Sequence, residues 1–349
     1  MSLLKKLAIA AVAGSMILSG CSDGEVVDEK KETSIFQKKE KVSKVNLLTG
    51  LEDMSEKGAG KRPVAIMVNN VEPAMPQYGV EAADVIFEIP VEGDLTRFMA
   101  MYADYTKVPE ICPIRSCRYY FPVMSEGFDA FYVHWGMDPS IEDHINGMNL
   151  DRFDGMANPY DLFGRDQGRL DEGYSLEHTA TFDGPKFTQI LEKEDYRLEL
   201  NEGYKDSAFK FNKKVKPAGE DACTQVDLDF GAQGSTFTYD AENDVYLKQI
   251  NGMNQIDAKT QNQLGFTNLV VLETSIEVRP DGNHKKIDIF GNDESVGYYI
   301  SNGTMKKIHW KKDGVKGRLK FFDEEGKEVK LNKGKTYIAF NYPGQSTFA

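Results

Sequence analysis

The sequence lacks an excess of positive charge. Its 349 residues carry 42 Lys and Arg against 55 Asp and Glu, which gives a formal net charge of −13 at pH 7. Nucleic-acid binding and non-specific attraction to an anionic membrane both depend on a basic surface. The charge balance argues against both, so no nucleic-acid partner is expected. It leaves room for a local basic pocket.

Enzyme signatures are also missing. The sequence contains no His-Glu-x-x-His pattern, no nucleophile elbow, no Walker loop and no dinucleotide-binding glycine fingerprint. A nucleotide-dependent enzyme is therefore disfavoured. We expect no cofactor and no metal ion.

Cysteine is sparse, with four residues in the chain. Three of them, Cys112, Cys117 and Cys223, follow the N-terminal segment, and an odd number cannot all pair with one another. The extended step from Cys112 to Cys117 spans about 16 Å, whereas a disulfide tolerates about 6 Å between Cα atoms. Small buried thiols are the favoured interpretation, and a Cys112–Cys117 disulfide would require a turn between them.

One apolar run stands at the N-terminus. Lys5 and Lys6 precede an apolar stretch over residues 7–17, and Leu-Ser-Gly-Cys ends it at Cys21. This order is typical of a bacterial lipoprotein signal. We expect cleavage before Cys21 and a diacylglycerol anchor on that residue, which would hold the protein on the outer leaflet of the cytoplasmic membrane, at its extracytoplasmic face. The alternative is an ordinary signal peptide that ends near a cysteine.

Composition divides the chain into four segments. Residues 1–20 form the signal, and residues 21–45 combine the lipidated cysteine with a flexible linker of mixed charge. Residues 46–210 mix short buried strands with helical stretches, which predicts an α+β domain with a mixed sheet. Residues 211–345 alternate polar and apolar side chains, which predicts a smaller antiparallel β-rich domain.

Three features of the strand pattern are specific enough to test. Residues 85–91 and 96–102 are separated by a short turn, so the two strands should pair antiparallel. Residues 268–278 are expected to form one long strand. Asn302-Gly303 is a typical hairpin turn between two further strands.

Four arginines stand out against the acidic background: Arg97, Arg115, Arg118 and Arg165. The planar guanidinium suits bidentate binding of phosphate or carboxylate, and Arg115 and Arg118, with Ser116 between them, could converge on one anion. The competing interpretation is that each arginine pairs with a nearby carboxylate. We take an arginine-lined anion site as the leading hypothesis.

Acidic and histidine side chains provide further candidates. Glu92 and Asp94 could hold a cation or act as acid and base, although a solvated or arginine-paired face is the commoner role. His134 and His178 are candidate bases or metal ligands. A histidine inside an apolar strand, as His134 is, is more often a hydrogen-bonded core residue.

Several stretches resemble the YerB-like family of bacterial lipoproteins. They cover residues 62–70, 92–98 and 112–120, and residues 303–337 are similar to the C-terminal domain of the family. The resemblance extends from about residue 46 to 345, and it implies a secreted two-domain lipoprotein without an established activity. The family usually has Gly and Ala at the positions of Cys112 and Cys117, so neither thiol is essential to the family chemistry. It has Pro-His-Asn where this chain has Glu177-His178-Thr179.

Residues 96–101 and 113–116 also resemble, more faintly, the LytR-CpsA-Psr phosphotransferases, in which strand-borne arginines and acids bind a polyprenyl pyrophosphate. Two functional hypotheses follow. The first is a non-enzymatic envelope protein whose arginine pocket binds an anionic cell-wall polymer, a precursor or an envelope protein. The second is an enzyme acting on a polyprenyl-linked pyrophosphate or a glycan, with the same arginines stabilising charge on a phosphate. Whether the protein is an enzyme stays open at this point.

Overall fold

The computed structural model describes residues 43–349, which form one compact unit. The predicted signal segment, Cys21 and most of the charged linker lie outside the described residues. The lipid anchor therefore stays a prediction. Within residues 43–349, no helix is both long enough and apolar enough to cross a bilayer.

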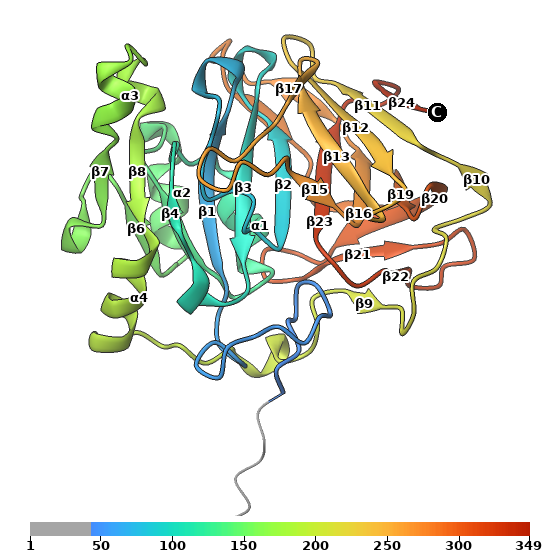
Figure 1. Cartoon of the computed structure of the whole chain (residues 1–349), viewed down its shortest axis with the longest axis horizontal. Coiled ribbons are helices and arrows are strands. Elements are labelled where there is room, and N and C mark those ends of the chain that lie inside the picture. The colour runs from blue at the N-terminus through green and yellow to red at the C-terminus, as the bar shows by residue number, and fades with distance from the viewer. Residues whose placement is uncertain (1–42) are drawn as a thin grey trace, which may run out of the picture. The chain divides into compact units, whose positions relative to one another are not determined.

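An eleven-stranded mixed sheet forms the centre of this unit (Figure 1). Its strand order is β10-β20-β19-β16-β23-β2-β3-β1-β5-β6, with β21 paired to β20. The strands are β1 (Val64–Asn70), β2 (Val85–Pro90), β3 (Thr96–Tyr102), β5 (Phe131–His134), β6 (Arg152–Asp154), β10 (Asp221–Ala222), β16 (Asn268–Glu273), β19 (Gly291–Ser301), β20 (Thr304–Lys312), β21 (Leu319–Phe322) and β23 (Thr336–Asn341).

The central sheet combines strands from both halves of the sequence. Strand β23, near the end of the chain, lies between β2 and β16 and pairs in parallel with both. In Figure 1 the blue and cyan strands β1 to β3 therefore stand beside the red and orange strands β23 and β16. Strands from residues 46–210 and from residues 211–345 share one sheet, while the domain boundary itself stays a prediction.

Smaller sheets and short helices surround the central sheet. A six-stranded sheet has the order β14-β13-β12-β11-β24 with β15 on β13, and a three-stranded sheet has the order β4-β8-β7. The pairs β17–β18 and β9–β22 are separate. These strands are β4 (Glu110–Ile111), β7 (Phe163–Arg165), β8 (Ala180–Asp183), β9 (Lys210–Phe211), β11 (Gln225–Asp229), β12 (Gly234–Asp240), β13 (Val245–Ile250), β14 (Met253–Asn254), β15 (Gly265–Phe266), β17 (Ile276–Val278), β18 (Lys285–Ile287), β22 (Lys330–Leu331) and β24 (Ser346–Phe348).

The helices are short. The α-helices are α1 (Tyr120–Glu126), α2 (Glu142–Gly147), α3 (Gln167–Asp171) and α4 (Gly184–Lys193). The 3-10 helices are η1 (Glu72–Ala74), η2 (Glu92–Asp94), η3 (Tyr105–Lys107), η4 (Pro139–Ile141), η5 (Pro159–Asp161), η6 (Leu176–His178) and η7 (Glu202–Tyr204).

The central strands are buried on both faces. Every residue of β1, β2 and β3 is buried, which explains why these strands are mostly apolar and lack a regular polar–apolar alternation. Along β1, Met67 joins an apolar cluster on one face of the sheet, and Ile66 and Val68 join a second cluster on the other. The sheet therefore separates two hydrophobic layers.

These observations confirm the α+β class with a mixed sheet and a strand-rich C-terminal part. Strands β2 and β3 pair antiparallel as predicted, and β19 and β20 form a hairpin around Asn302 and Gly303, both at positive φ. The prediction of one strand over residues 268–278 is wrong. Strand β16 ends at Glu273, because Thr274 turns away, with its Oγ1 donating to the carbonyl of Asp288, and β17 pairs elsewhere. Cys112, Cys117 and Cys223 are buried free thiols.

Candidate functional site

Three parallel strands end at one edge of the central sheet. Strand β1 pairs in parallel with β5, and β5 pairs in parallel with β6. Their carboxyl ends bring Asn69, Trp135 and Asp154 to this edge. The carboxyl ends of parallel strands are where ligands bind in many open α/β sheets. Two clefts lie along it.

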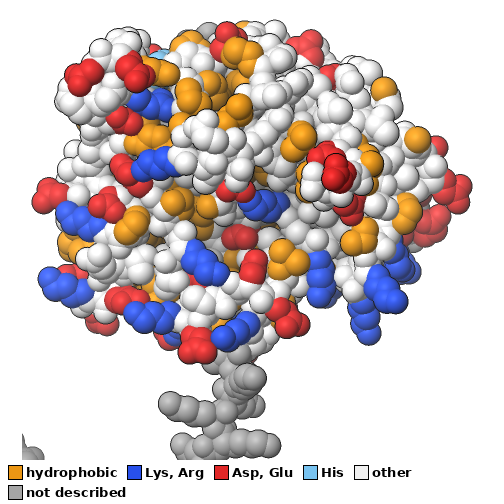
Figure 2. All heavy atoms as spheres, viewed as in Figure 1, with side chains coloured by type: hydrophobic (Ala, Val, Ile, Leu, Met, Phe, Trp, Pro, Cys, Tyr) orange, Lys and Arg blue, Asp and Glu red, His pale blue; other side chains and the backbone are white. Residues whose placement is uncertain are grey.

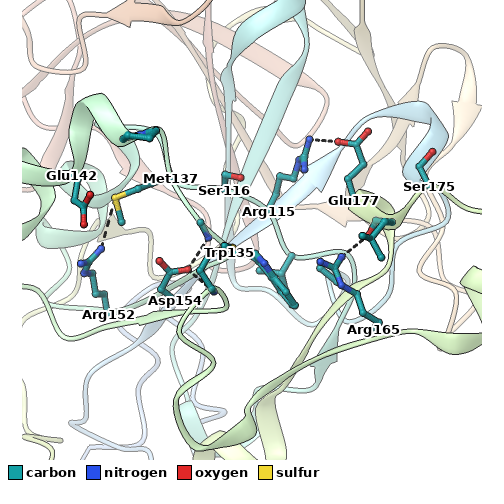
Figure 3. Close-up of a pocket in the computed structure, with 16 residues that line it drawn as sticks. Arg115, Ser116, Trp135, Met137, Glu142, Arg152, Asp154, Arg165, Ser175 and Glu177 are labelled. Carbon is teal, nitrogen blue, oxygen red and sulfur yellow. Dashed lines mark hydrogen bonds and ion pairs between the residues drawn. The ribbon is translucent and has the colours of Figure 1, made fainter.

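The first, here called the Trp135 cleft, has a volume of about 750 Å³. It receives side chains from the segment after β4, the loop after β5, strands β6 and β7, and helices α2 and η6 (Figure 3). Its lining residues are Ile114, Arg115, Ser116, Trp135, Gly136, Met137, Pro139, Glu142, Arg152, Asp154, Met156, Arg165, Ser175, Leu176, Glu177 and Ala180.

Arg165 is the most available cation of this cleft. Its guanidinium stacks on Trp135, with the guanidinium carbon 4.2 Å from the ring centroid, and its Nη1 donates to the carbonyl of Leu176 at 2.5 Å. Within residues 43–349, no carboxylate lies within ion-pairing distance of it. Burial and the charge of Arg115 lower the pKa of Arg165. The stacked ring fixes the plane of the guanidinium while leaving N–H groups toward the cleft.

Arg152 stands on the opposite wall, with Trp135 and Asp154 between it and Arg165 (Figure 3). Its Nη2 donates to Asn146 Oδ1 at 2.7 Å, and its Nη1 lies 3.9 Å from Met137 Sδ. Arg152 likewise forms no ion pair with any carboxylate of the described residues. Two arginines therefore face the cleft without charge partners.

Arg115 differs because it is paired. Its Nη2 lies 2.5 Å from Glu177 Oε2, and both side chains are partly exposed, at 29% and 49%. The Arg115 backbone is held on both sides, since its N–H donates to Met67 and its carbonyl accepts from Trp135. The backbone position of Arg115 is therefore fixed, while its side chain meets a solvent-exposed partner.

The cleft also contains acidic groups, which limit its positive potential. Asp154 accepts the backbone N–H groups of Gly136 and Met156 through Oδ1, at 2.7 and 2.9 Å. Glu177 forms an ion pair with Arg115. Glu142 is exposed and Asp154 has only backbone donors, so the groups without an oppositely charged partner are two arginines, Arg152 and Arg165, and two carboxylates, Glu142 and Asp154.

The predicted group of Arg97, Arg115 and Arg118 does not converge fully: Arg97 and Arg115 line the second cleft, and Arg118 lines neither cleft. Arg118 binds Glu92 with two nitrogens, through Nε at 2.9 Å and through Nη2. Arg97 is buried, with Nη1 donating to the Ser116 carbonyl at 2.7 Å and Nη2 lying 3.4 Å from Glu92. Both arginines are therefore held by one carboxylate, as the competing interpretation expected.

This arrangement sets the ionisation of Glu92. Burial works against its charged form, but the hydrogen bonds from Arg118 and the charge of Arg97 outweigh it and lower the pKa of Glu92 to about 2. Burial, aided by the charge of Arg118, lowers the pKa of Arg97 to about 9. A carboxylate with so low a pKa is a poor proton acceptor near neutral pH.

The remaining sequence candidates are dispersed. Asp94 pairs with Lys285 at 2.6 Å and lines neither cleft. His134 is fully buried, with Nδ1 3.0 Å from the Gly136 carbonyl, and burial lowers its pKa. His178 lies 3.0 Å from Asn69 through Nδ1, and burial lowers its pKa as well. His134 is therefore a core residue, whereas His178 reaches the second cleft.

The second cleft, here called the Arg97 cleft, has a volume of about 570 Å³. It lies where β1 and β2 end and β3 begins. Below it, Gln233 donates to Thr96, and Thr96 donates to the fully buried Glu88 at 2.6 Å. Its lining residues are Asn69, Val71, Glu72, Pro73, Val91, Glu92, Leu95, Thr96, Arg97, Arg115, Glu177, His178, Ala232, Gln233 and Asn251.

Sequence reasoning missed Trp135, Arg152, Asp154 and Glu177. A usable signal was present, because Trp135 directly follows an apolar strand and Asp154 ends another. Polar and aromatic side chains at strand ends are candidates for a binding edge. These four residues belong to no recognised sequence motif, so their spacing gave no signal.

Within residues 43–349, one group of three side chains has metal-ligand geometry: Asp138, Asp281 and His284. Arg279 lies 3.5 Å from Asp138 and 3.9 Å from Asp281. An arginine already neutralises these carboxylates, so the group is better described as an ion-pair cluster.

Comparison with known proteins gives consistent matches. Residues 48–197 match the N-terminal domain, and residues 226–338 the C-terminal domain, of the family described as protein of unknown function (DUF3048). "Putative lipoprotein YerB" of Bacillus subtilis (strain 168) is 28% identical over 296 residues, which is 83% of this chain and 84% of that protein. A crystal structure of YerB protein from Bacillus subtilis matches with a TM-score of 0.74 at 25% identity, over 86% of this chain and 98% of that chain. The chain therefore belongs to the YerB-like family of bacterial lipoproteins.

Proposed function

We propose that this lipoprotein is anchored through Cys21 on the outer face of the cytoplasmic membrane and binds an anionic component of the cell envelope in the Trp135 cleft. One observation carries the proposal. Arg152 and Arg165 face the same cleft from opposite walls, and neither has a carboxylate partner among the described residues. The lining as a whole is balanced, with three arginines against Glu142, Asp154 and Glu177, so the proposal rests on two positioned guanidinium groups and not on a net positive charge.

The chemistry of the cleft fits a phosphate-bearing ligand. Guanidinium groups donate two parallel hydrogen bonds to phosphate, and a hydrogen bond to a charged group contributes about 1.5–3 kcal/mol. Trp135, Met137 and Met156 add apolar surface between the two arginines, suitable for a sugar ring or a polyol carbon chain. The cleft thus combines anion recognition with apolar contact.

The charge distribution supports a specific site over bulk attraction. Figure 2 shows Lys and Arg side chains scattered among Asp and Glu over the face in view. A protein of formal net charge −13 does not attract a polyanion by its overall field. Binding would depend on a few positioned arginines.

The geometry gives less support to the enzyme hypothesis. Glu92 is bound by two arginines and has a pKa of about 2, and Asp94 pairs with Lys285. Neither is placed as an acid or base beside the unpaired arginines. Binding without turnover is therefore the better-supported function.

The test is binding of a purified wall polymer that carries phosphodiester groups. The full-length lipoprotein in a neutral detergent would be titrated with the polymer and compared with the Arg152→Gln/Arg165→Gln double variant. We expect the double variant to bind at least about tenfold more weakly, because two charge-assisted contacts are lost.

The matched control is Lys307→Gln, which removes one positive charge from an exposed position of β20. Its affinity should equal that of the wild type. Equal affinity of the wild type and the double variant, with unchanged circular dichroism, would exclude the Trp135 cleft as the site.

A further inference from the structure

The Trp135 cleft and the Arg97 cleft meet at one ion pair. Arg115 and Glu177 line both clefts, and they are the residues that the two linings share. Both clefts follow the same edge of the sheet, where β1, β2, β5 and β6 end. The Arg115 backbone, bound to Met67 and Trp135, runs between the two sides, and the Arg115–Glu177 ion pair is where the two linings meet.

We propose that the two clefts are halves of one groove for a linear polyanion, in which phosphodiester groups alternate with polyol or sugar units. In this proposal the ligand displaces Glu177 from Arg115 and runs from one cleft into the other. The inference rests on the proposed function for the Trp135 cleft. It adds the Arg97 cleft, the ion pair and the repeating character of the ligand.

The Arg97 cleft carries buried polar atoms without partners. Arg97 Nε, Arg115 Nε and Gln233 Oε1 form no hydrogen bond within the described part of the chain. Arg97 is 4% exposed and Gln233 is 3% exposed. Buried polar groups are satisfied in most native structures, so three such atoms in the lining of one cleft point to a ligand there.

The ion pair is suited to exchange. Arg115 and Glu177 are partly exposed, and exposed pairs contribute little to stability. A phosphodiester offers two acceptor oxygens to the guanidinium and can replace the carboxylate. Since the Arg115 backbone is fixed between Met67 and Trp135, the exchange requires only side-chain movement.

The remaining groups favour charges spaced along the ligand. Asn69, Gln233 and Asn251 offer uncharged amides, which suit hydroxyl groups. Glu72, which accepts from Asn251 at 2.9 Å, would repel a dense polyanion at this point. A ligand with neutral hydroxyl-bearing units between its phosphates would bind the amides and would keep its negative charges away from Glu72.

The first test uses glycerol phosphate and its phosphodiester-linked hexamer as probes, titrated calorimetrically into the full-length lipoprotein in neutral detergent. We expect the hexamer to bind at least about tenfold more tightly than the monomer, since it engages charge-assisted contacts in both clefts. Ala232→Trp fills the Arg97 cleft from an exposed position outside the Trp135 cleft. It should weaken hexamer binding by about tenfold and leave monomer binding unchanged.

The second test examines the ion pair. Glu177→Gln frees Arg115, and we expect hexamer affinity to rise about threefold or more, because the competing carboxylate is removed. Glu142→Gln is the matched control: it removes an acidic charge from the Trp135 cleft without contacting Arg115. A rise confined to Glu177→Gln supports the exchange, and an equal rise in both variants overturns it.

The outcomes separate the two proposals. If Arg165→Gln weakens both probes equally while Ala232→Trp changes neither, the Trp135 cleft stands as the site and the continuous groove is refuted. If the hexamer binds no better than the monomer, the repeating ligand is refuted. If neither probe nor the wall polymer responds to Arg152→Gln and Arg165→Gln, the proposed function itself fails.

Discussion

Two groups of arginines at the same edge of the sheet differ in whether a carboxylate pairs with them. At the Trp135 cleft, Arg165 lies on an aromatic ring and meets no carboxylate among the described residues, whereas at the Arg97 cleft Glu92 holds both Arg97 and Arg118. The residue type is identical, and the neighbouring carboxylate decides the role. Removing the partner of a buried arginine is costly because it leaves the charge uncompensated, whereas an arginine stacked on a ring at a cleft wall is available to a ligand.

Removing the Glu92 carboxylate should have the largest effect on stability. Glu92→Ala leaves Arg97 and Arg118 uncompensated in a mostly buried site, so the free energy of unfolding should fall by about 3 kcal/mol. Glu177→Ala, which breaks the exposed pair with Arg115, should cost less than about 1 kcal/mol. Urea denaturation followed by circular dichroism measures both. Equal losses would contradict the distinction between the two ion pairs.

The ion pair of Glu92 with its two arginines should also make the free energy of unfolding depend on pH. The pKa of folded Glu92 is about 2, below the ordinary glutamate value of about 4.3. A carboxyl group whose pKa is lowered on folding stabilises the folded state at any pH above its ordinary pKa. This contribution is lost as the pH falls from about 4.5 towards 2. With solvent screening taken into account, the contribution is about 2 kcal/mol.

The measurement compares the wild type with Glu92→Gln between about pH 3 and pH 7. The difference in unfolding free energy should be constant at neutral pH and narrow below about pH 4.5, because the Glu92 carboxylate then becomes protonated in the unfolded wild type while it stays ionised in the folded protein. A difference that stays constant down to about pH 3 would show that Glu92 is not held ionised by its arginines.

The smallest expected effect concerns the ring beneath Arg165. Trp135→Leu removes a cation–π contact of about 0.5–1 kcal/mol, so wall-polymer affinity should fall about threefold. Tyr204→Leu removes another ring stacked on an arginine, Arg318, outside the Trp135 cleft, and should leave affinity unchanged. A similar loss of affinity in both variants would indicate that the substitutions disturb the fold and do not act through the Trp135 cleft.

Local patterns predicted the strands well. The antiparallel pairing of β2 with β3 follows from a short turn, and the β19–β20 hairpin follows from Asn302-Gly303, because both depend on neighbouring residues. The parallel insertion of β23 could not be predicted. Tyr337 and Glu88 contact each other across a separation of 249 residues, and no local propensity encodes such a pairing.

The candidate site was predicted only in part. Three residues that the sequence analysis singled out, Arg115, Ser116 and Arg165, line the Trp135 cleft, and their role there stays a prediction. The sequence grouped Arg118 with Arg115 because they are three residues apart, although Arg118 points to Glu92, 26 residues away. Spacing along a chain does not show which carboxylate an arginine will meet after folding.

The central position of β23 has a consequence for how the chain is made. Residues 336–341 are synthesised long after β2, yet they fill the place between β2 and β16. Until they arrive, β2 presents an unpaired edge, and exposed strand edges promote aggregation. The sheet therefore closes only after β23 has emerged, and a truncation that removes residues 336–349 would disrupt the middle of the sheet and not only its edge.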